Sequence, residues 1–143
     1  MTGKNMQRTP LSLALLMTAT LAQAEPIRNV TLTEEDKTFQ EVMEPVAFAA
    51  AYGDRSTGEH GTFGRFPAGF ETPVHTHSHA YRAVVLKGEM TNPFAGQADA
   101  PVMRPGSFWS VAANAPHTTA CVSDVPCEFF MYGADTFDFL TPD

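Results

Sequence analysis

The chain has 143 residues, of which 43% are hydrophobic and 17% charged, and its formal charge at pH 7 is −7. This length is enough for one domain with a hydrophobic core. An acidic surface repels nucleic acids and anionic lipids, so we expect neither nucleic acid nor a membrane among the partners of the mature protein.

The first 24 residues have the layout of a secretory signal peptide. Lys4 and Arg8 precede an apolar stretch over residues 11–21, and Ala22-Gln23-Ala24 has the small-x-small pattern of a cleavage site. The apolar stretch is too short to span a bilayer, although an uncleaved anchor is the alternative interpretation. We therefore expect residues 1–24 to be removed and the protein to be periplasmic or secreted. The leader contains two of the nine basic residues and none of the 16 acidic ones, so the mature chain has a formal charge of −9.

A short helix is predicted near the start of the mature chain. Thr33-Glu-Glu-Asp36 supplies a capping hydroxyl followed by acidic residues in the first turn. Phe39, Val42 and Met43 follow at helical spacing. The helix is expected over residues 34–43, before Pro45, and should cover one open end of the structure that follows.

The remainder of residues 25–143 is expected to form a single β-domain. Short apolar runs are broken by Gly, Pro, Asn and Asp at near-even spacing, which is typical of a β-sandwich or barrel. Strands are predicted over residues 46–52, 60–67, 74–87 (one or two strands), 89–92, 107–111, 117–122 and 128–132, with 137–140 at a sheet edge.

The two cysteines, Cys121 and Cys127, are separated by Val-Ser-Asp-Val-Pro, a sequence rich in turn-forming residues. A close pair in an exported protein usually forms a disulfide, because the compartment is oxidising. We predict a disulfide at the base of a hairpin formed by the strands over residues 117–122 and 128–132. Metal ligation or a catalytic thiol is the alternative.

Histidines provide the main candidate for chemistry. His75, His77 and His79 alternate with small residues, and alternate side chains of an extended strand share one face. Two or three imidazoles that converge in this way can begin a divalent transition-metal site. His117 is the only strong candidate for a further ligand nitrogen, whereas His60 is predicted to be a surface residue.

This region resembles the first motif of the cupin superfamily, which has a Gly, five residues, His-x-His, three or four residues, a Glu, six residues and a Gly. Gly69, His75, His77 and Gly88 match that pattern. The resemblance covers roughly residues 58–133. A weaker second motif is found in Pro105-Gly106, the apolar strand with Phe108, Trp109 and Val111, and Pro116-His117.

The resemblance implies an all-β double-stranded β-helix, the cupin jelly roll, with a metal inside the barrel. Carried over residue by residue, His75, His77 and His117 are the expected ligands of a divalent transition metal (Fe, Ni, Zn, Cu or Mn). His79 is a further candidate, either as a ligand or as a hydrogen-bond partner of one, or it is a partly exposed histidine beside the mouth.

The glutamate of the cupin motif is missing. Its position is occupied by Tyr81, or by Arg82 with the longer spacing, and neither is an ordinary substitute for a carboxylate ligand. Both are candidate catalytic residues: Tyr81 to position substrate or metal-bound water, and Arg82 to hold a carboxylate or phenolate. The alternatives are a wall residue for Tyr81 and a solvated face for Arg82. Arg65 is a further candidate for holding such a substrate, whereas Arg104 is expected to face solvent.

The resemblance implies a metal-dependent enzyme, dioxygenase-like or acting through Lewis-acid chemistry, on a small organic substrate. A non-catalytic small-ligand-binding or sensory cupin is the alternative, and a purely structural exported domain is the third, so the sequence leaves open whether the protein is an enzyme. A homodimer through edge strands is the default expectation.

Overall fold

Eight β-strands and no helix are found in residues 28–142, which are the part of the chain that this computed structural model describes. Within this range, the residues from Thr31 onward form one compact unit. The signal peptide predicted for residues 1–24 lies outside the described residues. Within the described residues there is no helix with the length and apolar character needed to cross a membrane.

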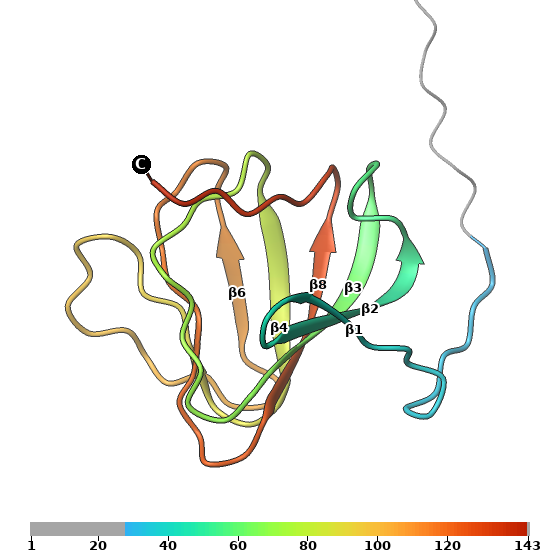
Figure 1. The fold of residues 1–143 in the computed structure, drawn as a ribbon, viewed down its shortest axis with the longest axis horizontal. Coiled ribbons are helices and arrows are strands. Elements are labelled where there is room, and N and C mark those ends of the chain that lie inside the picture. The colour runs from blue at the N-terminus through green and yellow to red at the C-terminus, as the bar shows by residue number, and fades with distance from the viewer. Residues whose placement is uncertain (1–27, 143) are drawn as a thin grey trace, which may run out of the picture. The chain divides into compact units, whose positions relative to one another are not determined.

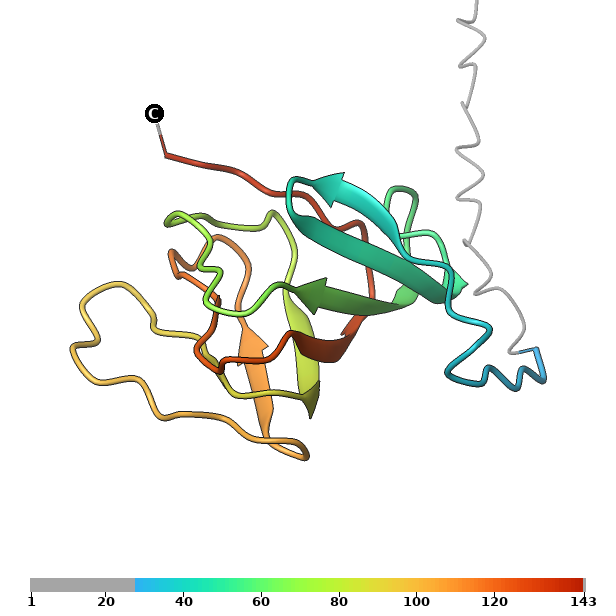
Figure 2. The ribbon, with the colours of Figure 1, turned by 60° about the horizontal axis from the view of Figure 1, so that its bottom comes forward.

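The strands form two antiparallel sheets. Figure 1 shows the larger of the two. Both Figure 1 and Figure 2 show the connection between β5 and β6, drawn in gold, extending away from the larger sheet. The larger sheet has the order β1 (Gln40–Met43), β2 (Val46–Gly53), β3 (His60–Phe66), β8 (Cys127–Gly133), β4 (Tyr81–Lys87) and β6 (Phe108–Val111), and the smaller one pairs β5 (Met90–Thr91) with β7 (Ala120–Cys121).

The core lies on the inner face of the larger sheet, where side chains alternate between buried and more exposed positions. In β3, Thr62, Gly64 and Phe66 are buried, and the residues between them are less so. Gly64 is needed here because a Cβ would stand 2.2 Å from the Phe129 ring, which fills the space above it. In β4 the same alternation turns Tyr81 inward.

The helix predicted over residues 34–43 does not form. The capping interaction is present, since the Thr33 amide and hydroxyl both donate to the Asp36 carboxylate at 2.9 and 2.8 Å, but it closes only a single turn. Gln40–Met43 then pair with the exposed edge of β2 and place Met43 against the core. Backbone pairing and burial therefore outweigh a weak local preference for helix.

The predicted disulfide between Cys121 and Cys127 is confirmed, with a Cα–Cα distance of 5.6 Å. The hairpin predicted around it is wrong. β7 pairs with β5 and β8 pairs with β3 and β4, so the disulfide connects strands of two different sheets. The Val122 amide donates to the Glu89 carbonyl at 2.8 Å, which keeps β7 with the smaller sheet. A disulfide agrees with folding in an oxidising compartment.

The chain beyond β8 runs back past the segment that carries the histidines, as the red trace in Figure 1 shows. Thr76 and Leu140 exchange backbone hydrogen bonds of 2.9 and 3.0 Å. The predicted edge strand over 137–140 is therefore reduced to a single bridge. That bridge brings Phe137 and Phe139 to the inner side of the histidine segment.

Candidate metal centre

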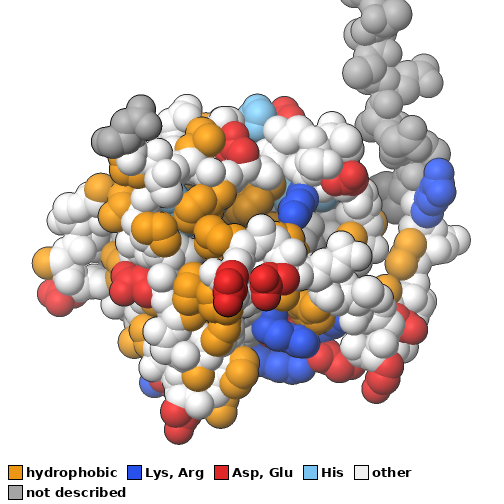
Figure 3. All heavy atoms as spheres, viewed as in Figure 1, with side chains coloured by type: hydrophobic (Ala, Val, Ile, Leu, Met, Phe, Trp, Pro, Cys, Tyr) orange, Lys and Arg blue, Asp and Glu red, His pale blue; other side chains and the backbone are white. Residues whose placement is uncertain are grey.

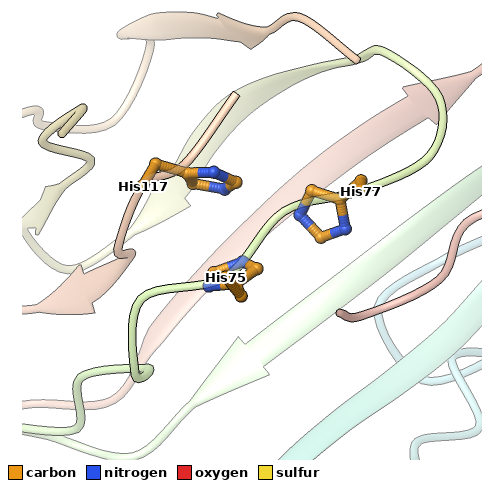
Figure 4. A group of neighbouring side chains, drawn as sticks. All are labelled: His75, His77 and His117. Atoms are coloured by element: carbon orange, nitrogen blue, oxygen red, sulfur yellow. The ribbon is translucent and has the colours of Figure 1, made fainter. Parts of the chain in front are cut away.

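Backbone pairing brings His75 and His117 face to face although they are far apart in the sequence. Each donates its amide hydrogen to the carbonyl of the other at 3.0 Å, and the Asn114 amide donates to the His77 carbonyl at 2.8 Å. Figure 4 shows the three imidazole rings turned toward one shared space, two from the segment before β4 and one from the segment before β7. The pairing of His75 with His117 therefore sets the register of the two segments, and that register brings the three rings together.

The three imidazoles form a buried group that can hold a metal ion. One ligand atom from each of His75, His77 and His117 lies within 4.8 Å of the others, and the residues are 3%, 2% and 1% exposed. Neutral imidazoles suit zinc, copper, iron and nickel. The donor set thus fits the metal that the cupin resemblance implies, and the fit is best for metals that accept nitrogen ligands.

Backbone carbonyls orient the rings. An imidazole that donates Nδ1–H to a carbonyl keeps its lone pair on Nε2, and this arrangement is general among metal-binding histidines. Nε2 of His117 is buried and has no hydrogen-bond partner among the described residues, so its lone pair is available to a metal ion. The Nδ1 acceptors are the carbonyls of Pro73 for His75 (2.9 Å), Asp138 for His77 and Ala115 for His117 (2.9 Å).

Burial keeps these imidazoles neutral. It lowers the pKa of His75 from 6.5 to about 4, with a further contribution from the neighbouring His117 and His77. Burial is also the main reason why the pKa values of His77 and His117 are lowered. At neutral pH all three rings therefore offer a lone pair, which a metal ligand requires.

We expect acid to destabilise the metal-free protein. The folded-state pKa of His75 is lower than its unfolded value, so between about pH 6.5 and pH 4 the unfolded chain binds more protons than the folded one. The free energy of unfolding must then fall as the pH decreases through this window. Urea denaturation of chelator-treated protein at about pH 7.5 and pH 5 measures the loss. A His75→Gln variant should lose less, and an equal loss in both proteins would contradict this assignment.

Tyr81, at the position of the missing glutamate, lies beside the group of three histidines. It is 5% exposed, its ring centroid is 5.1 Å from that of His77, and its hydroxyl accepts a hydrogen bond from Trp109 Nε1 at 3.2 Å. Burial raises the pKa of Tyr81 to about 12. It is therefore a neutral hydroxyl near the group and brings no negative charge.

Two of the predicted site residues lie elsewhere. Arg82 follows Tyr81 in β4, so strand alternation turns it to the exposed outer face. His79 is outside the histidine group because residues 78 and 79 form a bend that ends the alternation. Its Nδ1 is 3.2 Å from the carbonyl oxygen of Thr136, and its Nε2 is 3.6 Å from the carboxylate of Asp135.

The prediction that His60 is a surface residue is wrong. It is 0% exposed because it begins β3 on the inner face of the sheet. Its Nδ1 is hydrogen-bonded to the Thr62 hydroxyl at 2.9 Å, and its ring packs against Phe137. It is not a member of the metal-binding group.

A cavity of about 180 Å³ adjoins the metal group, and most of its lining is apolar. Phe137 stacks on His77 with 4.4 Å between ring centroids, and Phe139 stacks on His75 at 4.2 Å. Sequence reasoning missed both residues. The alternating Phe-Asp-Phe of residues 137–139 was the available signal, but nothing local connects it with the histidines.

Asp138, between these two phenylalanines, accepts hydrogen bonds from two residues of the histidine segment. Its carbonyl accepts the Nδ1 hydrogen of His77, and its carboxylate accepts hydrogen bonds from the Ser78 amide and hydroxyl at 2.8 and 2.5 Å. One residue of the C-terminal segment therefore fixes both the ring of a ligand and the backbone next to it.

Comparison with known proteins confirms the cupin fold. Residues 22–139 match a family model described as "Domain of unknown function (DUF4437)". Similar solved structures are the polyketide cyclase RemF from Streptomyces resistomycificus (17% identity, TM-score 0.67, covering 81% of this chain and 87% of that one) and KdgF from Halomonas sp. (12%, 0.60, 72% and 93%). A cupin-2 domain protein from Rhodospirillum rubrum, Rru_A2000, is also similar (15%, 0.60, 83% and 83%). At these identities the likeness establishes the fold alone. A comparison with curated proteins gave no match.

Proposed function

The chain belongs to the DUF4437 family, and from that premise we propose that it is an exported cupin that binds a divalent transition metal and acts as an enzyme on a small organic molecule. His75, His77 and His117 hold the metal. The observation that carries this proposal is the arrangement of the rings: each Nδ1 faces a backbone carbonyl, which leaves three Nε2 atoms for one ion. The disulfide supports export.

The three imidazole donors limit which metals the site can bind. Of Fe, Ni, Zn, Cu and Mn, the first four accept imidazole readily, whereas manganese prefers carboxylate and water oxygens. A divalent ion with three protein ligands keeps open positions and supplies Lewis-acid or redox chemistry to a bound molecule. The apolar walls of the cavity exclude water. Burial raises the pKa of Tyr81, so at neutral pH its hydroxyl can donate a hydrogen bond to an oxygen of that molecule.

One observation favours the alternative, a cupin that binds a small molecule without converting it. Among the described residues that line the cavity, Asp138 is the only carboxylate, and both of its oxygens already accept hydrogen bonds from Ser78. A carboxylate held in this way is a poor general base.

Expression of the full chain with its leader tests export and metal binding together. We expect periplasmic protein to begin at Glu25 by intact-mass measurement and to contain about one equivalent of transition metal by plasma mass spectrometry. Incubation with a mixture of small organic acids, alcohols and phenols then separates the two functions. An enzyme depletes at least one compound only when metal is present, whereas the binding protein retains a compound unchanged. Protein that stays in the cytoplasm with its leader attached would contradict export, and protein that takes up no metal would contradict the metal site.

We also infer that the protein forms homodimers. Figure 3 shows apolar side chains gathered over a broad area of one face. β6 lies at the edge of the larger sheet, and its Phe108 is 59% exposed. Light scattering should give the mass of a dimer for the wild type and of a monomer for Phe108→Glu. A monomeric wild type would refute the inference.

A further inference from the structure

Arg55 is a positively charged residue in the wall of the metal-site cavity, and sequence reasoning gave it no role. It lies in the turn between β2 and β3, is half-buried, and lines the cavity together with His75 and His77. Its guanidinium stands over the Phe48 ring at 5.3 Å, and its carbonyl accepts the Phe137 amide hydrogen at 2.7 Å. It forms no salt bridge with a carboxylate of the described residues.

The charges around this cavity favour an anion. Tyr81 occupies the position of the cupin glutamate, so β4 supplies no carboxylate there. Among the described lining residues, the remaining charges are those of Arg55 and Asp138. Asp138 has its hydrogen-bond needs met by Ser78, whereas the guanidinium of Arg55 has no anionic partner. A divalent ion held by three neutral ligands would add two uncompensated positive charges to this space.

We propose that the molecule bound here is a small organic carboxylate with a flat apolar body, and that Arg55 binds its carboxylate group. The inference rests on the proposed function, because the anion supplies the negative charge that a glutamate ligand gives elsewhere in the fold. A planar guanidinium can donate two parallel hydrogen bonds to a carboxylate. Phe48, Phe137 and Phe139 provide apolar walls for the body of the ligand, and a cavity of about 180 Å³ can hold a body the size of a single ring.

Benzoate is a suitable probe, with benzamide as a neutral compound of the same shape. Calorimetric titration of the zinc-loaded mature protein should show benzoate binding and no comparable binding of benzamide. In Arg55→Gln the dissociation constant for benzoate should rise roughly ten- to hundredfold, as expected for the loss of charge-assisted hydrogen bonds. Arg55→Lys keeps the charge and should fall between the two. Arg104→Gln, at an arginine whose side chain is 68% exposed and paired with Glu89, is the matched control and should bind as the wild type does.

Zinc content and thermal melting are measured for every variant, so that altered binding can be separated from altered folding. Equal benzoate affinity in the wild type and in a folded, zinc-loaded Arg55→Gln variant would overturn the inference, and so would a zinc-loaded wild type that does not bind benzoate. Both results leave the metal site intact. If the wild type takes up no zinc, the proposed function fails instead, and the effect of Arg55→Gln on benzoate binding by the metal-free protein still decides the role of Arg55.

Discussion

Replacing His77 with alanine should abolish metal binding while the β-domain stays folded. His77 is 2% exposed and supplies one of only three ligand atoms in the group, so its loss leaves two imidazoles with a water-filled gap. Changes to residues that merely hydrogen-bond a ligand cost about 10- to 100-fold in affinity, and loss of the ligand itself should cost more. The metal content of purified protein should therefore fall from about one equivalent to less than a tenth, measured by plasma mass spectrometry.

His79→Ala is the matched control for this experiment. It removes an imidazole from the same stretch of sequence, but one whose side chain is 43% exposed and lies outside the group. This variant should keep its metal. Full metal content in His77→Ala, or equal losses in both variants, would show that the ion is bound elsewhere. Circular dichroism of both proteins confirms that the sheets persist.

Replacing Glu128 with glutamine should cause the largest loss of stability that the structure predicts, about 3 kcal/mol of unfolding free energy. Glu128 is 1% exposed and accepts hydrogen bonds from Lys37 Nζ at 2.5 Å and Arg65 Nη2 at 2.9 Å. Burial opposes its ionisation, but the hydrogen bonds from these cations lower its pKa overall. The glutamine leaves the Lys37 ammonium, whose side chain is only 8% exposed, without its buried partner. Urea denaturation monitored by circular dichroism measures the change.

Glu34→Gln tests whether burial is the cause. Glu34 pairs with Lys37 at 2.7 Å and with Lys87 at 2.6 Å, but half of its side chain is exposed. An exposed ion pair contributes little, so this variant should lose much less stability than Glu128→Gln does. If Glu34→Gln and Glu128→Gln lost similar amounts of unfolding free energy, burial would not explain the effect. The buried Lys37–Glu128 pair would then not be what stabilises the contact between the N-terminal segment and β8.

The sequence allowed prediction of the metal group because a cupin motif encodes the register of two segments. The spacing of His75 and His77, and the position of His117 after a Pro-Gly strand, predicted that these residues come together, and the structure brings them together. Strand alternation also predicts the opposite faces of Tyr81 and Arg82, but only once the strand is known to begin at Tyr81. His79 lies apart from these three histidines because the alternation of side chains ends where the chain bends at residues 78 and 79.

Other features depended on contacts that no local pattern reveals. Thr33 and Asp36 form the predicted capping interaction, yet pairing with β2 draws Gln40–Met43 into a strand instead of a helix. The spacing of the cysteines predicted their disulfide, but membership of different sheets is decided by distant strands. Arg55 and Phe137 reach the cavity from a turn and from the C-terminal segment, and they are recognised as part of the site only in the folded chain.

A crystal structure with anomalous diffraction recorded at the absorption edge of the bound metal tests the metal centre most directly. We predict one anomalous peak, about 2.0–2.2 Å from Nε2 of His75, His77 and His117. A peak at another place, such as beside His79, would contradict a shared ion. So would a map without a peak in which the three histidine rings turn away from one another.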